Sequence, residues 1–151
     1  MIMWDLQSLL SQIGEVRRVG WRWEVRVPPE KISDSVSKLL KAAGMMASGP
    51  QDLHFATIVG IDKPDAGEIE LVYHFMFHKN KEYVLIRTSV KRDNPEVASI
   101  TSVIPGAEMN ENEVYDLLGV RFIGHPNLRK PFMTPENFRS DEFPLRKDWR
   151  R

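Results

Sequence analysis

Four acidic side chains lie close together in the sequence, at Glu108, Glu111, Glu113 and Asp116. Paired carboxylates carry out acid–base chemistry when burial separates their pKa values. Combined with the imidazole of His125, Glu111 and Glu113 would form the carboxylate–imidazole site of a small enzyme. Such a site needs a pocket in which the three side chains meet, so it stands as an alternative function for this chain.

The same acidic residues also have a structural interpretation, as the first turn of a helix. Asn110 precedes an apolar stripe, and Glu113 follows it at the spacing of a capping box. Carboxylates in a first turn stabilise a helix through its macrodipole, and such caps are common. We therefore expect a helix that begins after Asn110 and ends at Gly119, with acids that are structural rather than catalytic.

Other kinds of reactive site have little support in the sequence. The 151 residues include no cysteine, which excludes disulfides, thiolate nucleophiles and cysteine-held metal clusters among them. His74 and His78 would share one strand face, but zinc needs a third ligand that is not evident. No glycine-rich phosphate loop or nucleophile elbow occurs. We expect no metal site in these residues.

The overall composition argues against two further classes of protein. Twenty-one basic and 21 acidic side chains cancel, whereas a nucleic-acid-binding protein needs a cationic surplus to neutralise phosphates. No apolar run reaches the roughly 20 residues that a membrane-spanning helix requires. We therefore expect no nucleic-acid partner, and contact with a membrane only through partner proteins.

The last part of the chain differs from the rest in charge and composition. Residues 1–123 carry 14 basic and 17 acidic side chains, a net charge of −3, whereas residues 124–151 carry 7 and 4, a net charge of +3. The second segment also holds four prolines and seven bulky apolar side chains without regular period. We expect a compact α/β domain over 1–123 and an extended, basic, Pro-rich C-terminal arm over 124–151.

This arm suits a docking role better than a fold back onto its own domain, which is the alternative. Prolines hold the backbone extended, and basic side chains alternate with apolar ones. The cations would pair with carboxylates of a partner subunit. The residues expected to do so are Arg129, Lys130, Arg146 and Lys147.

Apolar periodicity predicts the elements that position these residues. Helices are expected at 3–13, 32–43, 94–100 and 110–118, and strands at 21–27, 54–61, 68–77 and 82–90. Alternation within 21–27 would place Trp21 and Trp23 in the core. The order predicts an α+β fold, with helices packed on a mostly antiparallel four-stranded sheet and an extended C-terminal arm.

Two blocks near the C-terminus match a known family in detail. Residues 107–130 read AEMNENEVYDLLGVRFIGHPNLRK, and residues 144–148 read PLRKD. Together they resemble the signature of the C subunit, also called the thirty-kilodalton subunit, of respiratory complex I, the NADH:quinone oxidoreductase. The same subunit type occurs in membrane-bound nickel–iron hydrogenases and in ferredoxin-linked sulfur-reducing complexes. Met109, Asn112 and Lys130 depart from the complex I pattern, which favours a hydrogenase-type or other archaeal-style relative.

The resemblance implies a specific role. Such subunits carry no cofactor and no catalytic residue, and they brace the large catalytic subunit that lines the quinone pocket or carries the nickel–iron site. A small iron–sulfur subunit would be a second partner, and iron–sulfur clusters, with nickel–iron or flavin, would belong to partner subunits. The complex would couple electron transfer to ion translocation, with this chain peripheral on the cytoplasmic face of the membrane.

The resemblance also assigns the motif residues to structure and partner contact. On this basis Gly119 and Gly124 permit turns, and His125 with Pro126 begins the arm. The full set is Glu111, Glu113, Tyr115, Asp116, Gly119, Gly124, His125, Pro126, Leu128, Arg129, Pro144, Leu145, Arg146, Lys147 and Asp148. Two other hypotheses remain: the small enzyme described above, and a free-standing module whose basic arm binds acidic proteins or RNA.

Overall fold

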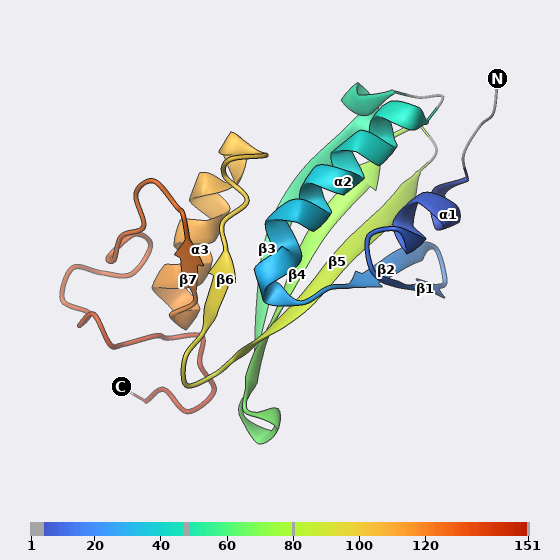
Figure 1. Cartoon of the computed structure of the whole chain (residues 1–151). Helices are drawn as coiled ribbons and strands as arrows, with labels where there is room; N and C mark the ends of the chain where they lie inside the picture. The colour runs from blue at the N-terminus through green and yellow to red at the C-terminus, as the bar shows by residue number, and fades with distance from the viewer. Residues whose placement is uncertain (1–4, 47–48, 80, 151) are drawn as a thin grey trace.

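The computed structural model describes residues 5–46, 49–79 and 81–150, so Met3 of the first expected helix lies outside the described residues. Within these described residues the chain forms three α-helices and seven strands (Figure 1). The helices are α1 (Leu6–Ser11), α2 (Ile32–Met45) and α3 (Glu108–Leu118). The strands are β1 (Glu15–Val19), β2 (Arg22–Arg26), β3 (Leu53–Lys63), β4 (Glu68–Phe77), β5 (Glu82–Lys91), β6 (Glu96–Ala98) and β7 (Arg121–Ile123).

Five strands form the main sheet in the order β1-β2-β5-β4-β3. Neighbouring strands are antiparallel except β2 and β5, which run parallel because the chain returns through α2, β3 and β4 before β5. β6 and β7 form a separate parallel pair. The fold is therefore α+β with a mostly antiparallel sheet, as expected.

Both longer helices cover the same face of the main sheet (Figure 1). The stripe of α2, formed by Ile32, Val36, Leu39 and Ala43, joins the apolar inner face of β4 in one core. α3 lies against β3 at Gly60, where a Cβ would stand 2.3 Å from the Leu118 side chain. Glycine is needed at this position because only a residue without a side chain allows so close an approach.

The sheet has one strand more than the four expected. The segment of β1 carries glutamate and two arginines among its five residues, and both valines are only half-buried, so it lacks the apolar alternation that marks a strand. It is held instead by its hairpin with β2, which turns at Gly20 with a φ of +60°. Trp21 lies in this turn and is 60% exposed, so its expected place in the core is wrong.

Two local expectations around the motif are also wrong. Residues 96–98 form strand β6 rather than a helix, because β7 pairs with them from 25 residues further along the chain. Helix α3 begins at Glu108, after Ala107, so Asn110 lies inside the helix and does not cap it. Gly119 does end the helix, in a left-handed conformation.

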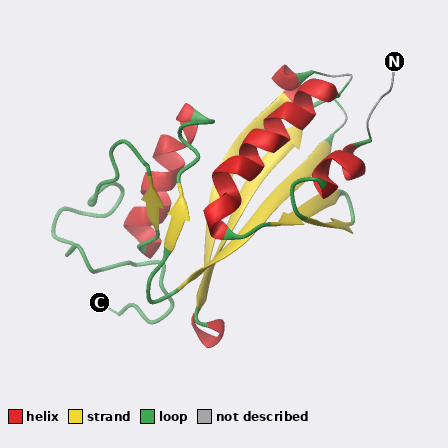
Figure 2. Cartoon of the chain, viewed as in Figure 1, coloured by secondary structure: helices red, strands yellow, loops and turns green. Residues whose placement is uncertain are grey.

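The arm, residues 124–151, contains no helix or strand among its described residues, 124–150 (Figure 2). It leaves β7 and passes along α3 (Figure 1). Its backbone and side chains hydrogen-bond to that helix at several points.

Candidate functional site

Asp116 on α3 is the centre of the contact between the helix and the arm. Its side chain is fully buried, and its Oδ2 accepts hydrogen bonds from the backbone N–H groups of Met133 (2.6 Å) and Thr134 (2.7 Å). Oδ1 accepts from the Thr134 hydroxyl at 2.8 Å and from the Lys130 ammonium at 3.0 Å. One carboxylate therefore fixes three points of the arm.

These contacts also decide the charge of Asp116. Burial alone would raise the pKa of its carboxyl, but the hydrogen bonds from Thr134, Met133 and Lys130 outweigh burial and lower the pKa. The Lys130 ammonium lies over the rings of Phe143 and Phe138. Lys130 thus pairs inside its own chain, in a buried setting, and not with a carboxylate of a partner as expected.

The PLRKD block joins the arm to α3 a second time. The Leu145 N–H donates to the carbonyl of Leu117 at 3.0 Å, and the Arg146 guanidinium donates to the carbonyl of Leu118 at 2.8 Å. Carbonyls at the end of a helix lack partners within the helix, so these two bonds satisfy them. A Cβ on Gly119 would lie 2.9 Å from the Phe143 ring, which packs directly on this turn.

The same block reaches the main sheet through Asp62 on β3. Its carboxylate accepts two bonds from Arg92, at 2.7 and 3.0 Å, and a third from the Lys147 N–H at 2.8 Å. Arg92 also pairs with Asp148 at 2.8 Å. The hydrogen bond from Arg92 and that from Lys147 lower the pKa of Asp62 against the opposing effect of burial.

Glu111 occupies a second buried polar position on α3. Its oxygens accept hydrogen bonds from the Ser99 hydroxyl at 2.6 Å and the Ile100 N–H at 2.9 Å, so it joins the helix to the segment that follows β6. Burial raises the pKa of Glu111, and these bonds offset it only in part. Glu111 lies in the first turn of α3, as expected, but it is buried and links the helix to the segment after β6.

The structure does not bring Glu111, Glu113 and His125 together in one pocket, as the small-enzyme hypothesis requires. Glu111 is fully buried, whereas Glu113 on the same helix is exposed. His125 uses both ring nitrogens locally: Nε2 lies 3.0 Å from the Glu108 carbonyl, and Nδ1 accepts from the Asn127 N–H at 3.0 Å. These two contacts fit a structural role for His125 at the turn where the chain enters the arm.

The remaining motif residues have mixed surroundings. Gly124 adopts a φ of +95°, as a turn requires, and Pro126 is exposed beside it. Tyr115 and Leu128 are half-buried against the core. Arg129 contributes its backbone N–H to the side chain of Asn112 at 3.0 Å, while its own side chain is exposed.

Sequence reasoning missed Asp62, Arg92, Ser99 and Asn112, which hold the arm and the β6–β7 unit. No local pattern marks them, because each acts on a residue brought close by the fold. Over the described part of the chain, no group of three or more His, Asp or Glu side chains is arranged to hold a metal ion. Within the same residues, no helix has the length and apolar character needed to cross a membrane.

Comparison with known proteins adds to this geometry. Residues 25–151 match the family described as the 30 kDa subunit of respiratory-chain NADH dehydrogenase. The C subunit of the NADH-quinone oxidoreductase of Moorella thermoacetica is 37% identical over 95 residues, which are 63% of this chain and 62% of that protein. The C subunit of the F(420)H(2) dehydrogenase of Methanosarcina mazei is 36% identical over 96 residues, 64% of this chain and 60% of that protein. The match thus spans about three fifths of these relatives.

Two solved structures have the same fold. A chain from the structure of the membrane-bound sulfane sulfur reductase, an archaeal respiratory membrane complex, superposes with a TM-score of 0.80 and 26% identity, over 96% of this chain and 83% of that one. The trypsin-resistant fragment of Nqo5 superposes with a TM-score of 0.64 and 22% identity, over 82% and 96%. The first likeness covers almost the whole chain, including most of the arm.

Proposed function

The chain belongs to the family of the 30 kDa subunit of respiratory-chain NADH dehydrogenase, and on this premise we propose that it is a structural subunit of a complex I-like, membrane-associated oxidoreductase. It holds no cofactor of its own and braces the large catalytic subunit. That partner lines the quinone pocket or carries a nickel–iron site, and the complex couples electron transfer to ion translocation. The relatives named as subunits of NADH-quinone oxidoreductase and F(420)H(2) dehydrogenase support this role.

The observation that carries the proposal is the arrangement of the arm. Its inner side is fixed to α3 and β3 by buried bonds to Asp116 and Asp62. Its outer side presents large apolar residues to solvent: Met133 is 59% exposed and Leu145 is 54% exposed. Met109, on the helix that the arm contacts, is 62% exposed. Buried anchors beneath exposed apolar side chains are typical of a preformed protein interface.

On this proposal the arm forms the contact with the large catalytic subunit, and a small iron–sulfur subunit of the same complex is a further partner. Iron–sulfur clusters, with nickel–iron or flavin, reside in those partners. The chain lies at the cytoplasmic face of the membrane and reaches the membrane only through them. The relative from an archaeal respiratory membrane complex supports this placement.

Co-purification from the native host tests the proposal. The chain is tagged, the membranes are solubilised mildly, and the subunits that return with it are identified by mass spectrometry. We expect a large subunit with a quinone pocket or nickel-binding cysteine pairs, beside iron–sulfur and membrane subunits. A chain that returns alone would overturn the proposal.

Matched variants then test the contact surface. Met133→Glu combined with Leu145→Glu places two charges on the outer side of the arm without removing a buried anchor, and should reduce recovery of the large subunit about tenfold or more. Met45→Glu, at the end of α2 and 56% exposed, introduces the same chemistry elsewhere and should leave recovery unchanged. Equal recovery with the double variant, the control and the unchanged chain would contradict docking through the arm.

A further inference from the structure

The face of the main sheet that points away from α2 and α3 is covered by no helix of the described chain. The strand register shows which residues lie on this face. Glu70 and Val72 of β4 alternate with the core residues Leu71 and Tyr73, so they lie on the side away from the core. This surface, the outer face, includes neighbours in register on each strand: Arg17 on β1; Arg22, Glu24 and Arg26 on β2; Arg87 on β5; Glu70 and Val72 on β4; and Val59, Ile61 and Lys63 on β3.

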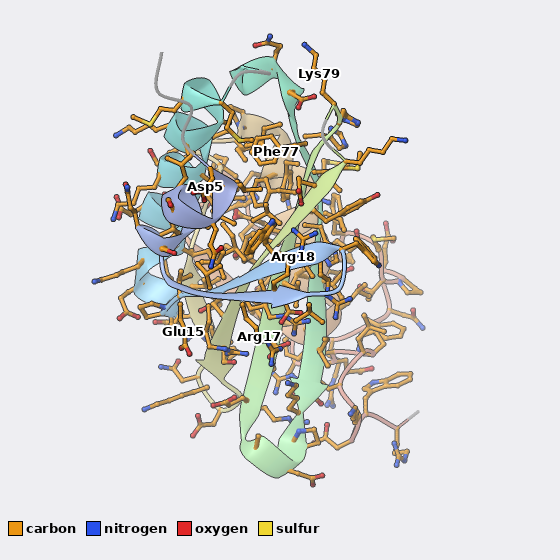
Figure 3. The ribbon with its side chains drawn as sticks, turned by 90° about the vertical axis from the view of Figure 1, so that its right-hand side faces the viewer. Asp5, Glu15, Arg17, Arg18, Phe77 and Lys79 are labelled. Atoms are coloured by element: carbon orange, nitrogen blue, oxygen red, sulfur yellow. The ribbon has the colours of Figure 1, made fainter. Side chains whose placement is uncertain are left out.

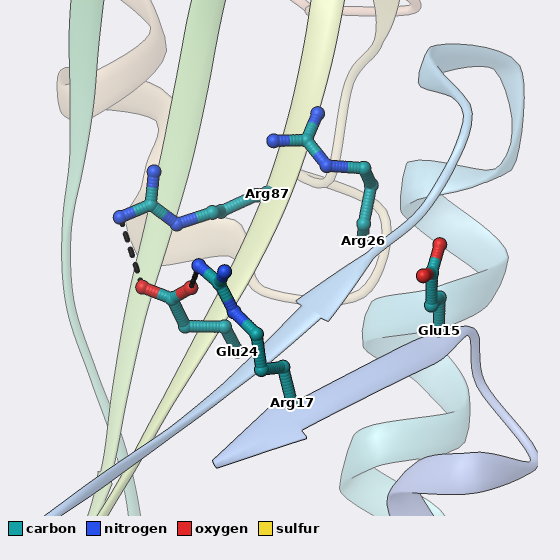
Figure 4. Close-up of a pocket in the computed structure, with 5 residues that line it drawn as sticks. All are labelled: Glu15, Arg17, Glu24, Arg26 and Arg87. Carbon is teal, nitrogen blue, oxygen red and sulfur yellow. Dashed lines mark hydrogen bonds and ion pairs between the residues drawn. The ribbon is translucent and has the colours of Figure 1, made fainter. Parts of the chain in front are cut away.

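Two carboxylates on the outer face are almost completely buried beneath cations. Glu24 pairs with Arg17 at 2.7 Å, Arg87 at 3.1 Å and Arg22 at 3.3 Å. The flanking guanidinium groups offset the effect of burial and lower the pKa of Glu24. Figure 4 shows Arg17 and Arg87 meeting Glu24 from two different strands.

Glu70 has a matching set of partners. It pairs with Lys63 at 3.1 Å, with Arg26 at 3.3 Å and also with Arg87. Arg87 therefore bridges both carboxylates from the middle of the sheet. Its Nε is buried and has no hydrogen-bond partner among the described residues.

The outer face carries more positive charge than these carboxylates neutralise. Five cations share Glu24 and Glu70. The register places the exposed Glu15 opposite Arg26 and the exposed Glu68 opposite Lys63, and Lys91, opposite Glu68 on β5, is a sixth cation, so six cations face four carboxylates. This local surplus stands out because residues 1–123 are negative overall. Arg17 lies on β1 of the hairpin that faces the viewer in Figure 3, and its side chain is 75% exposed although it pairs with Glu24.

Two features show that the surplus acts locally. Burial lowers the pKa of His74 on the same face, and the charges of Arg87 and Arg22 lower it further. A further positive charge is therefore disfavoured there. A hollow of about 200 Å³ lies over the cations, lined by Glu15, Arg17, Glu24, Arg26 and Arg87. The hollow is large enough for a carboxylate side chain.

An apolar strip lies beside the cations, toward β3. Val59 is 40% exposed and Ile61 is half-buried, while Val72 is buried between them and β5. Cations next to exposed aliphatic side chains match a peptide that carries both acidic and apolar residues. A nucleic acid fits less well, because phosphate binding would require more cations than remain after Glu15, Glu24, Glu68 and Glu70 are neutralised.

We propose that the outer face binds an acidic segment of a partner subunit, whose carboxylates pair with Arg17 and Arg26 and whose apolar side chains cover Val59. This inference rests on the proposed function, since it assigns a second interface within the same complex. The interface is distinct from the arm, because the outer face lies on the opposite side of the sheet from α3.

A photo-crosslinking amino acid in place of Val59 tests this contact in the assembled complex. After illumination and purification, the crosslinked peptide is sequenced by mass spectrometry. We expect a partner peptide with more Asp and Glu than Lys and Arg. Crosslinks to nucleic acid, to lipid or to a peptide without acidic excess would overturn the inference, and so would the absence of crosslinks in an intact complex.

Charge variants make the test specific. Arg17→Gln with Arg26→Gln removes two exposed cations, while Arg22, Arg87 and Lys63 still neutralise the buried carboxylates, so the sheet stays folded. The crosslink at Val59 should fall about tenfold. The control, Lys38→Gln with Lys41→Gln on α2, makes the same change of charge on the other side of the sheet and should leave the crosslink unchanged.

The outcomes separate this inference from the proposed function. A tagged chain that returns without any partner overturns both. A chain that returns with its partners, but whose crosslink is insensitive to Arg17→Gln with Arg26→Gln, overturns only the binding of an acidic segment. An acidic residue found in the crosslinked peptide provides a final check. Arg26→Glu should abolish the binding of this peptide, and changing the acidic residue to Lys in the same complex should restore it.

Discussion

Lys130 of the arm and Asp116 of α3 form an ion pair whose side chains are 3% and 0% exposed. The Lys130 ammonium also donates to the Asp116 carbonyl at 2.7 Å, so it binds both the side chain and the backbone of one residue. A buried pair of this kind fixes one arrangement of chain, because any other leaves a charge buried without a partner. It therefore determines where residues 130–134 of the arm lie on α3.

Asp116→Asn should detach the part of the arm around residues 130–134. The amide keeps the shape of the carboxyl, but its NH2 group faces N–H donors and the Lys130 charge is left uncompensated. Removing one member of a buried pair costs about 3–5 kcal/mol of unfolding free energy. Urea unfolding measures that loss, and trypsin should cleave after Arg129 much sooner than in the unchanged chain.

Asp148→Asn is the matched control for this variant. Its carboxylate pairs with Arg92 but is 68% exposed, so the loss should be small compared with that of Asp116→Asn. Equal losses in the two variants would show that the Lys130–Asp116 pair does not hold the arm.

Acidification should release the arm from the domain. The pKa values of Asp116 and Asp62 are both lowered from the ordinary value of 3.8. The stabilisation they give is complete above the unfolded-state pKa, and it is lost as pH falls through the lower folded-state values. The backbone amide signals of Met133 and Thr134, whose N–H groups donate to Asp116, should report the release below about pH 4 in NMR spectra. A contact between arm and domain that does not weaken as pH falls below about 4 would contradict these assignments.

The elements that sequence patterns predicted well are those with local signals. α2 has an apolar stripe at helical spacing, and strands 68–77 and 82–90 have apolar runs bounded by turns, so their positions agree with the structure to within a residue or two. Gly119 was likewise predicted to end α3, because glycine after an apolar stripe is a strong local signal.

The parts that sequence patterns did not reveal depend on distant residues. β6 has only three residues and exists because β7 pairs with it. Glu111 looks like a first-turn acid until Ser99 is placed beside it, and Asp116 looks like a surface acid until the arm returns over it. The family motif includes both residues, although their burial could not be derived from spacing.

Gly119→Ala should destabilise the junction between α3 and the arm. The backbone φ of +82° is unfavourable for alanine, and the added Cβ would press on Phe143 at 2.9 Å. Backbone strain alone costs about 1–2 kcal/mol, and the contact with Phe143 adds to it. Gly106→Ala is the control, because its φ is not positive and its Cβ would meet no atom within 4 Å. Thermal unfolding of both variants should show a clear loss only at Gly119.

Glu111→Gln should remove the loss of stability that ionisation of the buried Glu111 causes as pH rises. The folded-state pKa of Glu111 is raised above 4.5, so the folded chain holds this proton more tightly than the unfolded chain does. Ionisation of Glu111 therefore reduces stability as pH rises from the unfolded-state value through the folded-state value. Gln resembles the protonated acid: its NH2 can donate to the Ser99 hydroxyl, which in turn reaches Thr101 at 2.8 Å, while its carbonyl accepts from Ile100.

Relative to the unchanged chain, Glu111→Gln should therefore gain unfolding free energy as pH rises from about 4 to about 7. Glu113→Gln, on the exposed side of the same helix, should differ by less than about 0.5 kcal/mol at every pH. Urea unfolding across this range measures both variants. If the difference between Glu111→Gln and the unchanged chain stays constant with pH, Glu111 is ionised in the folded chain at no cost, and its raised pKa is wrong.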